Sequence, residues 1–202
     1  MPGRTIRILE ANPTIDDKHQ RVLDGATTVF LTYGYQRVTM EDIARAAEMS
    51  RPALYLLFRN KSDIYRAIAE RVFAQCAVAA DGALSGGGGI ADKLGRAVES
   101  IMSTIAEVAA SPHGPELLDL KNSLAGDLMG RWNASIAGLF AAAIERDAAE
   151  RGVDLAARGL TALGLAEILM DGLEGTKRRV TDPTLHREAA QRLIRVIELA
   201  VA

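Results

Sequence analysis

Apolar side chains recur at intervals of three and four residues along almost the whole chain. Ile64, Ile68, Val72 and Cys76, for example, fall on one side of a single long segment. Aromatic residues make up only 4% of the sequence, and β-branched residues do not alternate with polar ones. Because this spacing gives an α-helix one buried face and gives a β-strand none, the sequence predicts an all-α fold.

Composition excludes several classes of protein. With 202 residues, of which 49% are hydrophobic, the chain is long enough for a core and is not intrinsically disordered. The single cysteine cannot form an intrachain disulfide, which favours a reducing compartment. No apolar run approaches the ~18 residues of a membrane span, and the first twenty residues lack the apolar core of a signal peptide. We therefore expect a soluble, cytoplasmic protein with no membrane partner.

A run of four glycines at residues 86–89 interrupts the helical pattern. A phosphate-binding loop would need a preceding strand and a closing Gly-Lys-Ser/Thr, whereas a helical pattern precedes this run and "IADK" follows it. A flexible linker fits better, because consecutive glycines do not pack. The run predicts a boundary between an N-terminal domain of residues 1–83 and a helical C-terminal domain of residues 90–202.

Helix-start signals occur three times in the N-terminal domain. Thr39 followed by Asp42 fits a capping box, in which each side chain serves a backbone N–H group of the first turn. Ser50 can cap the next helix, with Pro52 in the first turn, where a missing N–H costs nothing. Asn60 can cap a third, longer helix. The chain between residues 39 and 58 is therefore predicted to form two short helices.

These two helices have the spacing of a helix-turn-helix. The turn falls at about residues 48–50, and Ala44 is small enough to lie where the helices cross. Leu54 and Leu57 follow ten and thirteen residues later, on the inward face of the second helix. A generic helical hairpin could show the same spacing, so the side chains on the outward face are needed to separate the two possibilities.

The outward face of the second helix carries Arg51, Ala53, Tyr55 and Arg59. The next helix starts at Lys61, so its cationic side chain and the positive end of its dipole point the same way. Arg51 and Ala53 lie near the end of the helix that usually enters the major groove, whereas Tyr55 and Lys61 suit phosphates. A solvated charged face would look similar, but the combination favours DNA binding.

Residues 17–75 resemble the TetR family of bacterial transcriptional regulators. The resemblance rests on "FLTYGYQRVT", on "VTMEDIARAAEMSRPALYLLFRNKSDIYRAI", and on Tyr55, Phe58 and Lys61 at the family spacing. It implies a helix-turn-helix head, with Thr39, Arg51, Tyr55 and Lys61 at DNA-contacting positions, and a C-terminal effector and dimerisation domain. With the neighbouring outward residues, the candidate DNA contacts are Thr39, Arg51, Pro52, Ala53, Tyr55, Arg59 and Lys61.

Two residues depart from the family pattern. Glu48 stands in the turn where the family usually has glycine, so a positive φ there would cost on the order of 1 kcal/mol and place a negative charge near DNA. Leu57 stands where the family often has His or Tyr, which removes a possible polar contact. Both departures keep open a dimerising interaction protein that no longer binds DNA.

The C-terminal domain offers an apolar lining with few charges. Trp132 is either a core residue or a wall of an effector pocket. We expect a mainly hydrophobic small-molecule effector, whose identity the sequence does not give. The candidate lining residues are Met102, Ile105, Leu118, Leu128, Trp132, Phe140 and Met170.

The last two predicted helices, at about residues 156–178 and 184–201, have the apolar surface that a dimer interface requires. The first is apolar almost all round, and the second has a seam spaced by three, four and three residues. They predict a homodimer joined by a four-helix bundle about a two-fold axis. The candidate interface residues are Leu169, Leu173, Ala190, Leu193, Ile197 and Ala200.

The remaining signals for chemistry are weak. Cys76 has the spacing of a core residue, and the three histidines are scattered without metal-ligand spacing. Residues 177–179, Lys-Arg-Arg, fit a helix C-terminus better than a second nucleic-acid patch. We expect no enzyme, metal or cofactor. The prediction is a repressor that an effector releases from double-stranded operator DNA; an effector-independent DNA-binding protein is the alternative.

Overall fold

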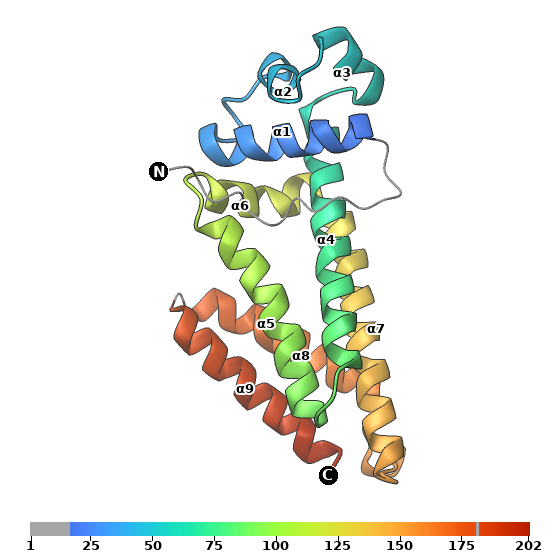
Figure 1. The fold of residues 1–202 in the computed structure, drawn as a ribbon. Coiled ribbons are helices and arrows are strands. Elements are labelled where there is room, and N and C mark those ends of the chain that lie inside the picture. Colours follow the sequence, from blue (N-terminus) through green and yellow to red (C-terminus); the bar gives the residue numbers. More distant parts are fainter. Residues whose placement is uncertain (1–16, 181) are drawn as a thin grey trace. The chain divides into compact units, whose positions relative to one another are not determined.

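The computed structural model describes residues 17–180 and 182–202, and all the long regular elements in these ranges are α-helices (Figure 1). The prediction of an all-α fold is confirmed. No helix among the described residues is long and apolar enough to cross a membrane. The helices are α1 (Asp17–Tyr33), α2 (Met40–Ala46), α3 (Arg51–Leu57), α4 (Lys61–Ser85), α5 (Ile90–Ala109), α6 (Gly114–Leu124), α7 (Gly126–Glu150), α8 (Ala162–Arg179) and α9 (Pro183–Ala200).

The chain forms two compact units that do not follow the expected boundary. The first contains the residues up to Ala74 together with Ser103–Met129, and the second contains Gln75–Met102 and Gly130–Ala202. The glycine run does separate α4 from α5 as a loop, but it lies within the second unit. The boundary differs from the expected one because α6 and the start of α7 pack with the N-terminal helices. As a result, α4, α5 and α7 each contribute residues to both units.

The first unit, which we call the head, has one continuous hydrophobic core. In Figure 1, α2 and α3 lie on one side of α1, and α6 lies on the other. Val22, Ile43, Leu54 and Ile64 are fully buried in this core, and Leu128 from α7 belongs to the same cluster. The core of the helix-turn-helix therefore includes a residue far along the chain.

Helices α1 and α2 cross in backbone contact. A Cβ atom on Gly25 of α1 would lie 2.8 Å from the carbonyl carbon of Ala46 and 2.9 Å from the amide nitrogen of Ala47. Real Cβ atoms do not approach backbone so closely, so only glycine fits here. This contact fixes α2 on α1.

The three predicted helix starts are confirmed. The Asp42 amide donates to Thr39 Oγ1 at 3.2 Å, and the Thr39 amide donates to Asp42 Oδ2 at 3.0 Å. These hydrogen bonds from Thr39 lower the pKa of the Asp42 carboxyl. Ser50 accepts from the Ala53 amide at 3.3 Å, and Asn60 Oδ1 caps the start of α4. Local capping chemistry thus sets where α2, α3 and α4 begin.

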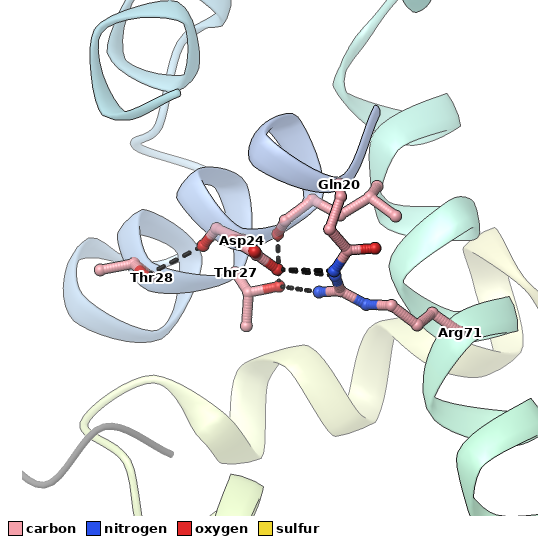
Figure 2. Close-up of polar contacts among 6 residues, drawn as sticks. Gln20, Asp24, Thr27, Thr28 and Arg71 are labelled. Atoms are coloured by element: carbon pink, nitrogen blue, oxygen red, sulfur yellow. Dashed lines mark hydrogen bonds and ion pairs between the residues drawn. The ribbon is translucent and has the colours of Figure 1, made fainter. Parts of the chain in front are cut away.

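A buried arginine ties α4 to α1 (Figure 2). The Arg71 side chain is 2% exposed, and its Nη1 donates to Asp24 Oδ1 at 2.6 Å. Its Nη2 lies 3.5 Å from Thr27 Oγ1, and Gln20 Nε2 donates to Asp24 Oδ1 at 3.1 Å. Among the described residues, Arg71 Nε and Gln20 Oε1 find no hydrogen-bond partner. Asp24 is therefore the group that compensates the buried charge.

The second unit is built around the packing of α8 on α9. Leu193 of α9 packs on Gly172 of α8, where a Cβ would lie 2.7 Å from Leu193 Cδ1. Helix α8 begins later than expected, at Ala162, because Thr161 caps it and Gly159 takes a φ of 70°. The preceding residues Ala156–Arg158 form a 3₁₀ turn instead of the start of α8.

Candidate DNA-binding surface

The structure turns most of the predicted DNA contacts toward solvent. Helix α3 is held on the head by Leu54, which is fully buried, and by Leu57, which packs partly buried against the core. Leu57 therefore belongs to the inner face of α3. The exposed candidates are Thr39, Arg51, Pro52, Tyr55 and Arg59, whereas Ala53 and Lys61 are half-buried.

Arg51 and Tyr55 form a pair one helical turn apart. Arg51 Nη2 donates to the Tyr55 hydroxyl oxygen at 3.4 Å, and the guanidinium carbon lies 5.5 Å from the centre of the tyrosine ring. The hydrogen bond to Tyr55 raises the pKa of Arg51. A guanidinium and a phenol side by side offer donors both to phosphates and to guanine edges. This pair is the most polar part of the α3 surface.

Lys61 makes contacts that the sequence did not suggest. Its Nζ donates to the main-chain carbonyl oxygens of Tyr35, Gln36 and Val38, at 2.7, 3.2 and 3.1 Å. The ammonium also lies 4.5 Å from the centre of the Tyr35 ring, and burial lowers the pKa of Lys61. An ammonium has three hydrogens, and these carbonyls occupy all of them. The phosphate contact stays a prediction, and it competes with this role in the turn between α1 and α2.

Leu56 was missed by the sequence analysis. Its side chain is 88% exposed, the highest value among the large hydrophobic residues that the structure describes as exposed. The signal was available, because Leu56 lies between two inward leucines, at a position that helical spacing turns outward.

Glu48 has a φ of 53°, as its place in the turn predicted. The Met49 amide reaches back to the Ala44 carbonyl at 3.0 Å, which closes the turn between α2 and α3. Left-handed backbone favours glycine because other residues bring Cβ close to the carbonyl oxygen. Glycine would adopt this backbone conformation without strain, so the strain in the turn comes from the Cβ atom of Glu48.

The Glu48→Gly substitution should raise the free energy of unfolding by about 0.5–1 kcal/mol, since it removes the Cβ from a left-handed residue. Urea unfolding followed by circular dichroism would measure this. Glu48→Ala is the matched control, because it removes the same charge and keeps the Cβ. Equal gains in the two variants would mean that the charge, not the backbone, destabilises the turn.

The candidate effector residues fall in both units. Ile105, Leu118 and Leu128 lie in the first, and the other four lie in the second. Leu128 is buried in the head core and Phe140 is fully buried, whereas the rest are half-buried. A hollow of about 420 Å³ in the second unit has a different lining, which includes Asp92, Arg96 and Glu198. The effector pocket stays a prediction.

The predicted dimer seam lies mostly inside the protomer. Leu169, Ala190 and Ile197 are buried within the second unit, and Leu193 packs on Gly172. Leu173 and Ala200 are half-buried. The spacing of three, four and three residues therefore reflects the packing of α9 within its own chain. The large hydrophobic residues that α8 and α9 expose are Leu163, Ile168, Leu185, Val196 and Leu199.

Cys76 is buried, in agreement with the core role that its spacing suggested. Within residues 17–180 and 182–202, no group of three or more His, Cys, Asp or Glu side chains could hold a metal ion. Of the first twenty residues, which carried the expectation about a signal peptide, residues 1–16 lie outside the described residues.

The geometry defines a helix-turn-helix protein with an exposed, cation-bearing second helix. Residues 22–68 match the sequence model of the bacterial regulatory proteins of the tetR family. These findings support a transcriptional regulator of the TetR family, and the match to the family model lies in the head.

Sequence similarity to the matching relatives covers only part of the chain. The chain is 34% identical over 53 residues to IcaR of Staphylococcus epidermidis, a negative regulator of the biofilm operon icaADBC, covering 26% of this chain and 29% of IcaR. It is 36% identical over 56 residues to the activator FasR of Mycolicibacterium smegmatis, covering 28% and 26%. A repressor of Mycobacterium tuberculosis is 34% identical over 62 residues, covering 28% and 33%. The matches thus span a third or less of these relatives.

Solved structures extend the likeness of fold to nearly the whole chain. Reduced NemR of E. coli has a TM-score of 0.63 at 17% identity, covering 90% of this chain and 97% of that one. SmeT of Stenotrophomonas maltophilia has a TM-score of 0.60 at 17% identity, covering 96% and 92%. AlkX of a Dietzia strain has a TM-score of 0.58 at 21% identity, covering 91% and 94%. These similarities support the expected architecture of a helix-turn-helix head with a helical C-terminal region.

Proposed function

We propose that this protein is a transcriptional repressor that binds double-stranded operator DNA through α2 and α3. One observation carries the proposal: α3 buries Leu54 and presents Arg51 and Tyr55 to solvent, and Arg59 is exposed just after its end, within a segment that matches the tetR family model. The second helix of such a motif lies in the major groove. We propose repression because two of the similar proteins are named as a negative regulator and a repressor. FasR is named as an activator, so activation of transcription is the alternative.

The direct test is an electrophoretic titration of the full chain on the DNA upstream of its own gene. Specific helix-turn-helix proteins bind their sites about 10³-fold or more tighter than unrelated DNA. We expect that ratio between the upstream fragment, or a site enriched from random sequence, and a scrambled fragment of the same length. Equal affinity for all fragments, or no binding, would leave a dimerising protein without operator function.

A homodimer fits this proposal, because a palindromic operator requires two recognition helices about 34–36 Å apart. We assign the interface to the exposed apolar surface of α8 and α9. Leu185, Val196 and Leu199 lie on one face of α9, at spacings of eleven and three residues, and remain exposed in the protomer. This replaces the buried seam as the contact between subunits.

The Leu199→Ala substitution should raise the dimer dissociation constant about tenfold, the equivalent of ~1.4 kcal/mol, because it truncates an apolar interface side chain. Analytical ultracentrifugation over a dilution series would measure the change. Val78→Ala, which truncates an exposed aliphatic side chain of α4, is the control and should leave the constant unaltered. The same constant in wild type and Leu199→Ala would move the interface elsewhere.

Release from DNA is assigned to a small, mainly hydrophobic effector. The support is the apolar character of the half-buried candidates Met102, Ile105, Trp132 and Met170, and the fact that α4 contributes residues to both units. An effector shifts the protein only as far as it binds one state better than the other. A screen of apolar small molecules for loss of the protein–DNA complex tests this step; no response to any of them would favour effector-independent binding.

A further inference from the structure

The outer face of α3 is divided into two columns of different chemistry. Residues four apart lie above one another on a helix, so Arg51 stands over Tyr55 and Pro52 stands over Leu56. The first pair is joined by the hydrogen bond and the cation–π contact described above. Pro52 and Leu56 are both exposed and offer no donor or acceptor in their side chains. The recognition helix therefore has a polar edge and an apolar edge.

Leu56 has no role in holding α3 on the head. The buried Leu54 and the partly buried Leu57 supply the packing, while Leu56 leaves 88% of its surface in water. Removing an apolar side chain from water is favourable, so this surface favours any apolar partner that α3 meets. The cations Arg51 and Arg59 on the same exposed stretch favour an anionic partner, which agrees with DNA.

An apolar side chain can recognise one feature of the major groove. Donor and acceptor groups on guanine, cytosine and adenine need hydrogen-bonding partners, which the Pro52–Leu56 column lacks. The C5-methyl group of thymine is the apolar group that the groove displays. We propose that Leu56, with Pro52 one turn before it, contacts a thymine methyl in each operator half-site. The inference rests on the proposed function, since it requires α3 to enter the major groove.

Replacing thymine by uracil tests this contact, because uracil lacks only the methyl group. An operator enriched from random sequence by the wild-type protein would be rebuilt with single thymine-to-uracil changes. At one position in each half-site, wild-type affinity should fall about fourfold, which corresponds to the ~0.8 kcal/mol of one buried methyl-sized group. Uracil at the other thymines should have a smaller effect.

Variants at position 56 connect the methyl group to the leucine. Leu56→Ala should bind the thymine operator more weakly and lose the difference between thymine and uracil at that position. Leu56→Met, which keeps a long apolar side chain, should retain the difference. Val78→Ala, at another exposed aliphatic residue, should keep the wild-type profile at every position. Thermal unfolding of each variant checks that the exposed substitution leaves the head folded.

The outcomes separate this inference from the proposed function. A wild-type protein that enriches no operator would overturn the proposed function itself. A protein that binds its operator specifically, yet responds to no uracil change or responds equally with Leu56→Ala, would overturn only the thymine contact. Arg51 and Tyr55 would then carry the base readout without their apolar neighbours.

Discussion

The Asp24→Ala substitution is expected to lower the free energy of unfolding by about 3 kcal/mol, because it leaves the buried Arg71 guanidinium without its counterion. Removing one partner of a buried ion pair costs about 3–5 kcal/mol, and the 36% exposure of the Asp24 side chain places this pair at the lower end. Gln20 Nε2 would lose its acceptor in the same change. Urea unfolding of the full chain would measure the loss.

A double substitution distinguishes a lost ion pair from a damaged helix. Asp24→Ala combined with Arg71→Met removes both charges and keeps an apolar side chain in the Arg71 site, so most of the stability should return. Asp81→Ala, an exposed carboxylate of α4, is the control and should change stability by less than ~0.5 kcal/mol. If the double variant were as unstable as Asp24→Ala, the uncompensated charge would not be the cause.

The Lys61→Met substitution is expected to lower the free energy of unfolding by about 2 kcal/mol, within the ~1.5–3 kcal/mol range for a hydrogen bond to a charged group. Methionine keeps the apolar stem but leaves the carbonyl oxygens of Tyr35, Gln36 and Val38 without the ammonium. The turn before α2 would loosen as a result. Thermal and urea unfolding report this change without any DNA present.

Arg59→Met gives the matched comparison two residues earlier. Arg59 is exposed, so its loss should change stability by less than ~0.5 kcal/mol while reducing the slope of log affinity against log salt by about one unit. For Lys61→Met we expect the opposite pattern: a loss of stability and almost no change in the slope of log affinity against log salt. A fall of one unit in the slope for Lys61→Met, at unaltered stability, would instead assign its ammonium to a DNA phosphate.

Sequence reasoning succeeded where a structure depends on neighbours in the chain. The capping box at Thr39 and the Ser50 cap each follow from residues within a few positions of one another. The left-handed backbone at Glu48 was implied by the resemblance, since the family usually has glycine at that position of the turn. Other contacts join residues that are distant in the chain. Asp24 and Arg71 are 47 positions apart, and Lys61 is 23 to 26 positions from the residues whose carbonyls it binds. Neither set of contacts produces a regular spacing in the sequence. For Lys61 there is a further reason, because a main-chain carbonyl can belong to any residue type.

The predicted dimer seam shows a different limit of sequence reasoning. The spacing of Ala190 and Ile197 correctly indicates a buried face, but periodicity does not name the element that covers it. In the structure that element belongs to the same chain. Leu199, which the three-four-three pattern passed over, is exposed. An interface prediction from spacing needs the protomer's own packing first.

The head is not an interchangeable module, although its family signature ends at residue 68. Its core closes with Leu117, Leu124 and Leu128, which the chain supplies only after the glycine run. A hybrid regulator made by joining this head to a relative's C-terminal region at residues 85–89 would receive a foreign α6 and a foreign start of α7. Grafts that carry residues 103–129 along with the head avoid that mismatch. The helix-turn-helix and the later helices that complete its core therefore have to be transferred together.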